Sequence, residues 1–325
     1  MVGQVGPRAR VNLIVAIAAV AAAGAVVGVT VLQSPASANK SAAAPLPKGA
    51  PPLVLDFGLR TDAEALALER ATALYAKHRR AAAARIFLRY RSLEAEIGAA
   101  FARWPDGSLE RMKQLVAERP RSSLAELHLG LALYWSGRRS DAVAAFRRAE
   151  RLQPDTYAAV RAEDALHPEM PPGRPQFVPS FSTPARIVRL APQAQLAALA
   201  RLGGVRGKLL YGVALQRLER PVSAEHEFAA AAALAPDDLE AQVAAAVGRF
   251  TKDAPARAFS RLGPLAQRFP RAATVRFHLG LLLLWLRELP QARKELRLAV
   301  ADAPKSPLGR EAKSLVDSLK SIGTK

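Results

Sequence analysis

Residues 205–306 divide without gap or overlap into three consecutive units of 34 residues. Each unit places a glycine or alanine early, an alanine at its middle, a large apolar residue four positions later and a proline near its end. The three sets are Gly212, Ala224, Phe228 and Pro236; Ala246, Ala258, Leu262 and Pro270; and Gly280, Ala292, Leu296 and Pro304. Small residues let two helices approach closely, and a proline ends the second helix. The period therefore predicts stacked helical hairpins, which need no single large core.

Residues 123–156 carry the same pattern most completely. Its members there are Leu129, Gly130, Gly137, Ala142, Phe146, Ala149 and Pro154. The first helix of this unit, ELHLGLALYW ending at Trp135, recurs 150 residues later as RFHLGLLLLW ending at Trp285. The pattern resembles the tetratricopeptide repeat (TPR), and the resemblance covers roughly residues 61–306. It implies an all-α, TPR-like helical-hairpin solenoid of about six to seven repeats, some of them degenerate.

The chain on either side of the regular repeats fits the same architecture. Order is expected from residue 61, where Thr61 and Glu64 have the spacing of a capping box at a helix start. Residues 89–122 form a degenerate repeat that lacks the early glycine and the central alanine. Residues 307–325 supply a terminal helix, amphipathic and basic on its outer side, and a tail. This helix is expected to cap the last apolar face of the stack.

A proline-rich insertion interrupts the repeats at residues 167–184. It contains six prolines, so it cannot be helical. Its two phenylalanines, Phe177 and Phe181, suggest two roles. Either they pack back onto the array as a structural plug, or the insertion folds over the concave groove as a lid or occupies it like a ligand.

The N-terminal region reads as a membrane segment followed by a tether. Residues 11–32 are 22 consecutive uncharged residues, about 33 Å long as a helix, which matches the hydrocarbon core of a bilayer. They form either an uncleaved single-pass anchor or a signal that is cleaved near Ala38. The basic flank at residues 1–10 is expected to stay in the cytoplasm, which places the repeats outside it. Gly24 and Gly28 offer a dimer contact within the span.

Residues 33–60 are expected to form a flexible tether, because residues 33–52 have almost nothing large to bury. Within it, residues 53–59 form a short apolar patch, either a strand-like arm or a staple onto the first helix.

Residues that would support catalysis or metal binding are not found in suitable patterns. The chain has no cysteine, and its five histidines form no metal-ligand spacing. His128 and His278 occupy equivalent places in two repeats and are interpreted as packing residues. No phosphate-binding loop and no nucleophile elbow is present. We therefore expect a protein that is not an enzyme, with no catalytic residues, no cofactor, no metal and no nucleic-acid partner.

The resemblance implies a binding groove lined by first helices. Ligand peptides in the family lie in the concave face, and the family's inner-face positions fall here mostly on apolar and aromatic residues, with flanking arginines. The candidate groove residues are Leu127, Leu131, Tyr134, Trp135, Arg217, Phe277, Leu281 and Trp285. Such a groove suits an extended or helical peptide with apolar anchors and some acidic character.

The formal charge of +19 leaves a second function open. The leading hypothesis is a membrane-anchored, extracytoplasmic scaffold of the cell envelope that binds partner proteins or peptides. The alternative is a charge-driven binder of anionic envelope polymers or lipid head groups. Salt separates the two, because a polyanion binder loses most of its affinity at high ionic strength.

Overall fold

The structure is a computed structural model that describes residues 47–322. The predicted cytoplasmic flank at 1–10, the predicted anchor at 11–32, the predicted cleavage site near Ala38, the predicted Gly24–Gly28 contact and most of the predicted tether lie outside the described residues. A search of the described part of the chain finds no helix with the length and apolar character needed to cross a membrane.

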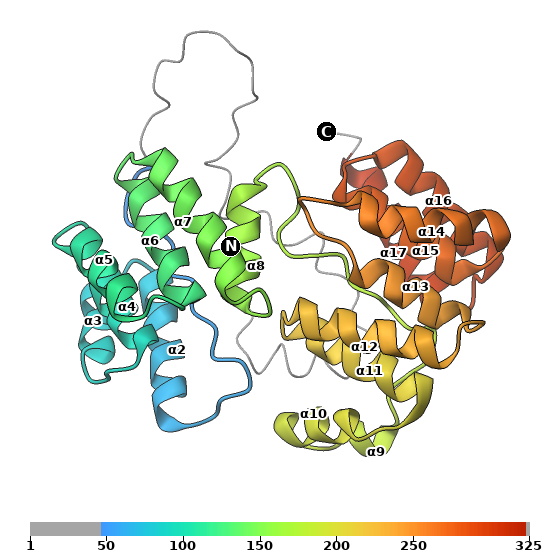
Figure 1. The fold of residues 1–325 in the computed structure, drawn as a ribbon, viewed down its shortest axis with the longest axis horizontal. Helices are drawn as coiled ribbons and strands as arrows, with labels where there is room; N and C mark the ends of the chain where they lie inside the picture. The colour runs from blue at the N-terminus through green and yellow to red at the C-terminus, as the bar shows by residue number, and fades with distance from the viewer. Residues whose placement is uncertain (1–46, 323–325) are drawn as a thin grey trace, which may run out of the picture. The chain divides into compact units, whose positions relative to one another are not determined.

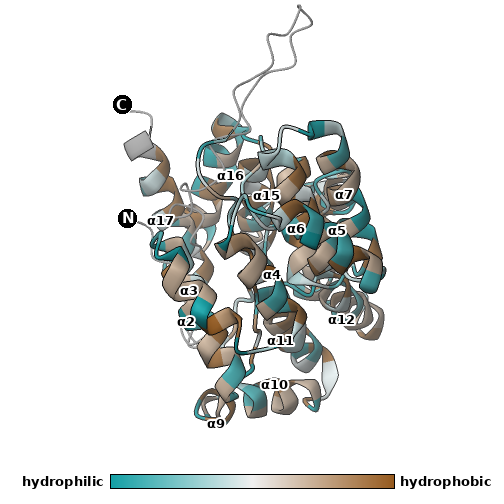
Figure 2. Cartoon of the chain, turned by 90° about the vertical axis from the view of Figure 1, so that its left-hand side faces the viewer, coloured by the Kyte–Doolittle hydropathy of each residue, from teal (hydrophilic) through white to brown (hydrophobic). Residues whose placement is uncertain are grey.

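The described chain divides into two compact units, and the division falls within the proline-rich insertion. Unit 1 comprises residues 47–169 and unit 2 comprises residues 170–322. Every regular element in residues 47–322 is a helix (Figure 1). Hydrophilic and hydrophobic residues alternate along the ribbons, as expected of helices that bury one side (Figure 2). The predicted solenoid at 61–306 is thus built as two stacks of hairpins.

Unit 1 contains three helical hairpins and a closing helix. The helices are α2 (Ala63–Ala76), α3 (Arg80–Phe87), α4 (Leu93–Ala102), α5 (Ser108–Glu118), α6 (Ser123–Trp135), α7 (Arg139–Leu152) and α8 (Tyr157–Leu166). Consecutive helices pack together along the whole unit, and α2, α4 and α6, the first helices of the hairpins, also contact one another in turn. The first helices therefore share one face of the stack.

Unit 2 repeats this plan after a short helical insertion. Its helices are α9 (Ala185–Val188), α10 (Pro192–Ala200), α11 (Gly204–Arg217), α12 (Pro221–Leu234), α13 (Leu239–Gly248), α14 (Ala256–Arg268), α15 (Ala273–Trp285), α16 (Leu289–Asp302) and α17 (Pro307–Ile322). The hairpins α11–α12, α13–α14 and α15–α16 begin within one residue of the predicted 34-residue boundaries. The terminal helix α17 packs on α16 and α15, as predicted for a cap.

The predicted small-to-large contacts hold the hairpins together. A Cβ added at Gly212 would lie 2.4 Å from a ring carbon of Phe228, and one at Gly130 would lie 2.5 Å from Phe146. Gly280 has the same relationship with Leu296, at 2.8 Å. Glycine is required at these points because any side chain would displace the residue of the facing helix.

Two local expectations for unit 1 are corrected. The N-cap of α2 is Asp62, whose carboxylate accepts a hydrogen bond from the amide of Ala65, so Thr61 and Glu64 do not form the capping box. Asp62 also bonds Arg60, and this contact lowers its pKa to about 2. In the degenerate second hairpin the small residue is Gly98, which approaches Phe87 of the preceding hairpin.

Candidate functional site

Each unit holds an extended segment of its own chain against the first helices of its hairpins. In unit 1 this segment is arm 1, residues 49–57, which precedes α2. In unit 2 it is arm 2, residues 173–181, which follows the proline-rich turn and precedes α9 (Figure 1). Neither segment contains helix or strand. Arm 1 buries its apolar side chains against the unit, and Leu53 and Phe57 are only 5% and 6% exposed.

 In unit 2 the matching residue Phe177 is 1% exposed, and Phe181 is partly buried. Both arms are therefore seated as extended peptides would be.

A buried histidine holds arm 1. The backbone amide of Val54 donates a hydrogen bond to Nε2 of His128, with 3.2 Å between the two nitrogens. Nδ1 of the same ring lies 2.8 Å from the carbonyl oxygen of Leu124, one turn earlier in α6. The ring of Phe101, on α4, packs edge-on against the imidazole at 5.3 Å. His128 thus ties the arm to α6 while α4 supports the ring.

The equivalent histidine holds arm 2 in the same way. The amide of Val178 donates to Nε2 of His278 at 2.9 Å, and Nδ1 lies 2.7 Å from the carbonyl oxygen of Thr274. The ring of Phe177 stacks on the imidazole with 5.0 Å between centroids and 20° between planes. The two histidines, 150 residues apart in the sequence, therefore make one and the same contact.

The hydrogen bonds determine which nitrogen of each imidazole ring carries the proton. A carbonyl oxygen only accepts, so Nδ1 carries the proton, and Nε2 is left as the acceptor for the amide of the arm. Both side chains are fully buried. Burial lowers the pKa of His128 and of His278 to about 4, although the bonds to the helix carbonyls act in the opposite direction. Both imidazoles are consequently neutral at physiological pH.

First helices of the other hairpins also bond the arms. On α2, the hydroxyl of Tyr75 donates to the carbonyl oxygen of Pro51 at 2.6 Å, and burial raises the pKa of this tyrosine. On α11, Oε1 of Gln216 accepts from the amide of Phe177 at 3.0 Å. These bonds fix the backbone of each arm at a second point, three residues before Val54 in arm 1 and one residue before Val178 in arm 2.

Two further side chains bond the region of arm 2. Oε1 of Glu240, on α13, accepts from the amide of Ser180 at 2.9 Å. Burial raises the pKa of Glu240, while its bonds to Ser180 oppose that rise. Nζ of Lys252, only 2% exposed, donates to the carbonyl oxygen of Pro171 just before the arm. Arm 2 is therefore bonded by residues of α11, α13 and α15, the first helices of all three hairpins.

The eight candidate groove residues lie on the first helices, as predicted, but they divide by burial. Leu127, Leu131, Phe277, Leu281 and Trp285 are buried within their units, whereas Tyr134, Trp135 and Arg217 are half-buried. The insertion at 167–184 contributes arm 2, whose Phe177 is buried in the core of unit 2 while Phe181 packs against that core, as expected if the two rings pack back onto the array.

Three polar groups on these first helices stand out. The indole Nε1 atoms of Trp135 and Trp285 are buried without a hydrogen-bond partner in the described part of the chain. Such orphaned donors are uncommon in protein interiors, and here they occupy equivalent positions. Burial also lowers the pKa of Arg217 to about 10. The face of unit 2 thus carries a partly desolvated positive charge next to Gln216.

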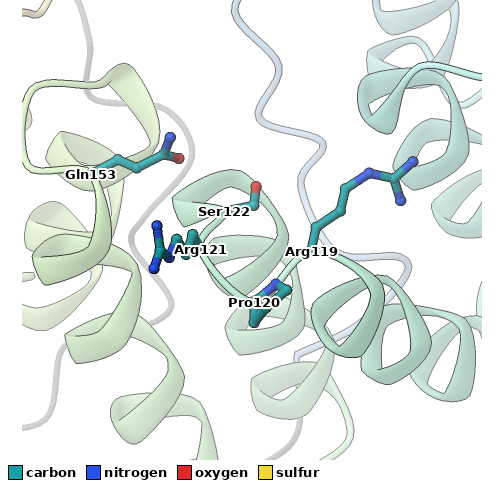
Figure 3. A pocket seen from close by; sticks show the side chains of 5 residues that line it. All are labelled: Arg119, Pro120, Arg121, Ser122 and Gln153. Carbon is teal, nitrogen blue, oxygen red and sulfur yellow. The ribbon is translucent and has the colours of Figure 1, made fainter.

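A surface pocket of about 390 Å³ lies elsewhere in unit 1. It is lined by Arg119, Pro120, Arg121, Ser122 and Gln153, between α5 and α6 (Figure 3). Its polar groups already serve the fold. The Ser122 hydroxyl caps α6, Gln153 accepts from the amide of Ser123, and Arg119 pairs with Glu96 and Glu118. None of the candidate groove residues lines this pocket.

The arms are the functional feature that the sequence analysis did not recognise as a pair. Arm 1 reads GAPPLVLDF and arm 2 reads GRPQFVPSF, which share the pattern G-x-P-x-Φ-V-x-x-F, where Φ is a large apolar residue. This recurrence, together with the recurrence of the histidine helix, was the available signal. Among the described residues, no group of three or more histidine, aspartate or glutamate side chains is placed to hold a metal ion.

Comparisons with known proteins give a limited picture. No protein-family model matches the chain, and no curated protein matches its sequence. Among solved structures, the chain is similar to YrrB, described as a TPR protein with an unusual peptide-binding site. The TM-score is 0.30 and the identity 15%, over 63% of this chain and 99% of that one.

The chain is also similar to the APC/C hetero-tetramer Cut9–Hcn1. The TM-score is 0.27 and the identity 15%, over 79% of this chain and 56% of that one. Both TM-scores are low, so the description of this chain as helical-hairpin repeats rests on the helix pairs themselves.

Proposed function

We propose that this protein is a non-catalytic scaffold of the TPR-like class, which binds extended segments of partner proteins on the first-helix faces of its two units. The observation that carries the proposal is the seat of the arms. Each unit binds an extended stretch of polypeptide through its backbone amides and its apolar side chains. A surface that binds such a stretch within its own chain has the chemistry to bind one from another protein.

The proposal includes a location. Residues 11–32 would anchor the chain in a membrane, with the two units on the extracytoplasmic side. The length of this uncharged run and the basic residues before it support the assignment. A scaffold held in this way would gather partners of the cell envelope at the membrane surface.

Site-specific photocrosslinking tests the binding face. A photoreactive amino acid replaces Tyr134, half-buried on α6, in the intact protein in its native membrane. The control carries it at Leu88, which is 56% exposed beyond the end of α3, the second helix of its hairpin. Captured proteins are identified by mass spectrometry. We expect capture from position 134 and little from position 88.

A second set of variants distinguishes binding in the groove from binding driven by charge. Capture should fall when Trp135 and Trp285 are both changed to alanine, and it should survive in the control Trp104→Ala. Capture that ignores the Trp135 and Trp285 changes and disappears at high salt would contradict the proposal. That result would favour the charge-driven function, for which the net charge of +19 is the supporting observation.

A further inference from the structure

The two arms share a pattern of four identical residues at equivalent positions. Gly49 and Gly173 begin them, and both glycines have a φ of +81°, a left-handed conformation that other residues rarely adopt. A proline follows two positions later, then the buried Leu53 or Phe177, and directly after it the valine whose amide bonds the histidine. The pattern therefore recurs in the sequence, and its opening glycine recurs with the same φ.

The surfaces that receive the arms match as well. Counting from the pair Phe87 and Phe228, which follow the small-to-large pattern in the first hairpin of each unit, Tyr75 of α2 corresponds to Gln216 of α11. Both side chains bond the arm backbone close to the buried apolar residue. The first hairpin and the third hairpin thus hold the arm in the same order in both units.

We infer that arms 1 and 2 are two copies of a built-in ligand, and that each unit is a receptor for extended segments with the pattern G-x-P-x-Φ-V-x-x-F. The partner bound by the scaffold carries this pattern and replaces arm 1. This inference rests on the proposed function and names its ligand.

The replaceable arm is arm 1 because of its connections. Arm 2 lies between α8 and α9, so helices flank it on both sides. Among the helices of the two described units, arm 1 adjoins only α2 and precedes every hairpin of its unit. Since a tethered arm competes at a high effective concentration, a free peptide should bind wild-type protein at least about 100-fold more weakly than protein whose arm is weakened.

Peptide binding to the full chain in detergent solution tests the inference. The probe is a fluorescent peptide of residues 47–60, followed by fluorescence anisotropy. The arm-weakened variant is Leu53→Ser with Phe57→Ser. Its control is Leu88→Ser with Leu234→Ser, which changes two exposed leucines. We expect saturable binding to the arm-weakened variant, competition by an unlabelled peptide of residues 171–184, and weak binding to the control.

A backbone change in the peptide tests the histidine contact. N-methylation at the position of Val54 removes the proton donated to His128 and should abolish binding. The matched peptide is N-methylated at Leu55, whose amide donates no hydrogen bond to the described residues. It should retain most of its affinity. Equal binding by the two methylated peptides would overturn the inference, and so would a folded arm-weakened variant that binds neither arm peptide.

If circular dichroism shows that the arm-weakened variant has lost its helices, a protein with a cleavable link between arm 1 and α2 is used in place of that variant. A protease site is placed at residues 58–61 of otherwise unchanged protein, and the cut chain is incubated with excess labelled peptide. Exchange of arm 1 for the peptide supports the inference, and failure to exchange overturns it.

The outcomes distinguish the failure of this inference from the failure of the proposed function. Captured partners that lack the pattern would overturn this inference and leave the scaffold function standing. Peptide exchange without any captured partner would overturn the scaffold function, and only the affinity of unit 1 for the pattern would remain.

Discussion

Phe177 lies face to face with His278, and the amide of the next residue, Val178, donates to the same imidazole. One ring therefore holds the arm by stacking and by a hydrogen bond. The same hydrogen bond joins Val54 to His128 in unit 1. Because these rings are fully buried, we expect them to be the firmest attachment of each arm.

Replacing His278 with leucine should destabilise unit 2. Leucine fills a similar space but cannot accept the amide proton of Val178, and a buried amide without a partner costs about 1–3 kcal/mol. The measurement is urea unfolding of the full chain with Trp104 and Trp135 changed to phenylalanine, so that the fluorescence reports Trp285 alone. The control is His226→Leu on the exposed side of α12, which should change the free energy of unfolding by less than about 0.5 kcal/mol. Equal effects of the two changes would contradict the prediction.

Stability should fall between pH 6.5 and pH 4. In this window the unfolded histidines bind protons, whereas the folded ones, with pKa values of about 4, do not. Acid therefore favours the unfolded state until the folded rings also protonate, near pH 4. The expected loss between pH 7 and pH 5 is about 2 kcal/mol per histidine.

Unfolding at a series of pH values checks this dependence. The His278→Leu variant should lose about half of the slope, because only His128 then titrates in this way. NMR of the imidazole protons gives an independent reading. Two of the five histidines should show no titration above pH 5, and normal titration of all five would contradict the assignment.

Gly212→Ala should destabilise the hairpin α11–α12 by about 1–3 kcal/mol, because the new methyl group would overlap the ring of Phe228. A second change, Phe228→Leu, should recover part of the loss, since the next repeat uses the pair Ala246 and Leu262 at the same positions. Thermal unfolding measures both variants. Gly263→Ala is the control, because a Cβ there would meet nothing within 4 Å. A double variant less stable than Gly212→Ala would contradict the proposed packing.

Arg217→Met should leave the protein as stable as the wild type or more stable. Methionine keeps much of the side-chain volume and removes a desolvated charge. The control is Arg297→Met at an exposed position of α16, which should have no measurable effect. A loss of more than about 1 kcal/mol for Arg217→Met would show that this guanidinium stabilises the fold.

The hairpins could be predicted from the sequence because their signal is periodic. Three predicted boundaries, at residues 205, 239 and 273, fall within one residue of the starts of α11, α13 and α15. The glycine contacts also follow from the pattern, since a small residue facing a large one has few other uses. The capping residue of α2 was missed by one position, because Thr61 and Asp62 are both good caps.

The seats of the arms could not be predicted in the same way. An extended segment has no period, and it is held here through backbone amides, which every residue except proline possesses. His128 bonds an amide 74 residues away, and His278 bonds one 100 residues away. The insertion of α9 and α10 between arm 2 and its first hairpin also gives the arms a different spacing from the 150 residues that separate the histidines. These features hide the recurrence from a search for one fixed period.

The arms have a consequence for how such a chain can lengthen. A hairpin stack with a bare inner face would expose apolar surface each time a copy was added, and exposed apolar patches promote aggregation. Because each unit brings its own arm to cover that face, a duplicated gene segment encodes a protein part that is already shielded. A chain that lengthens by whole units therefore exposes no additional bare inner face.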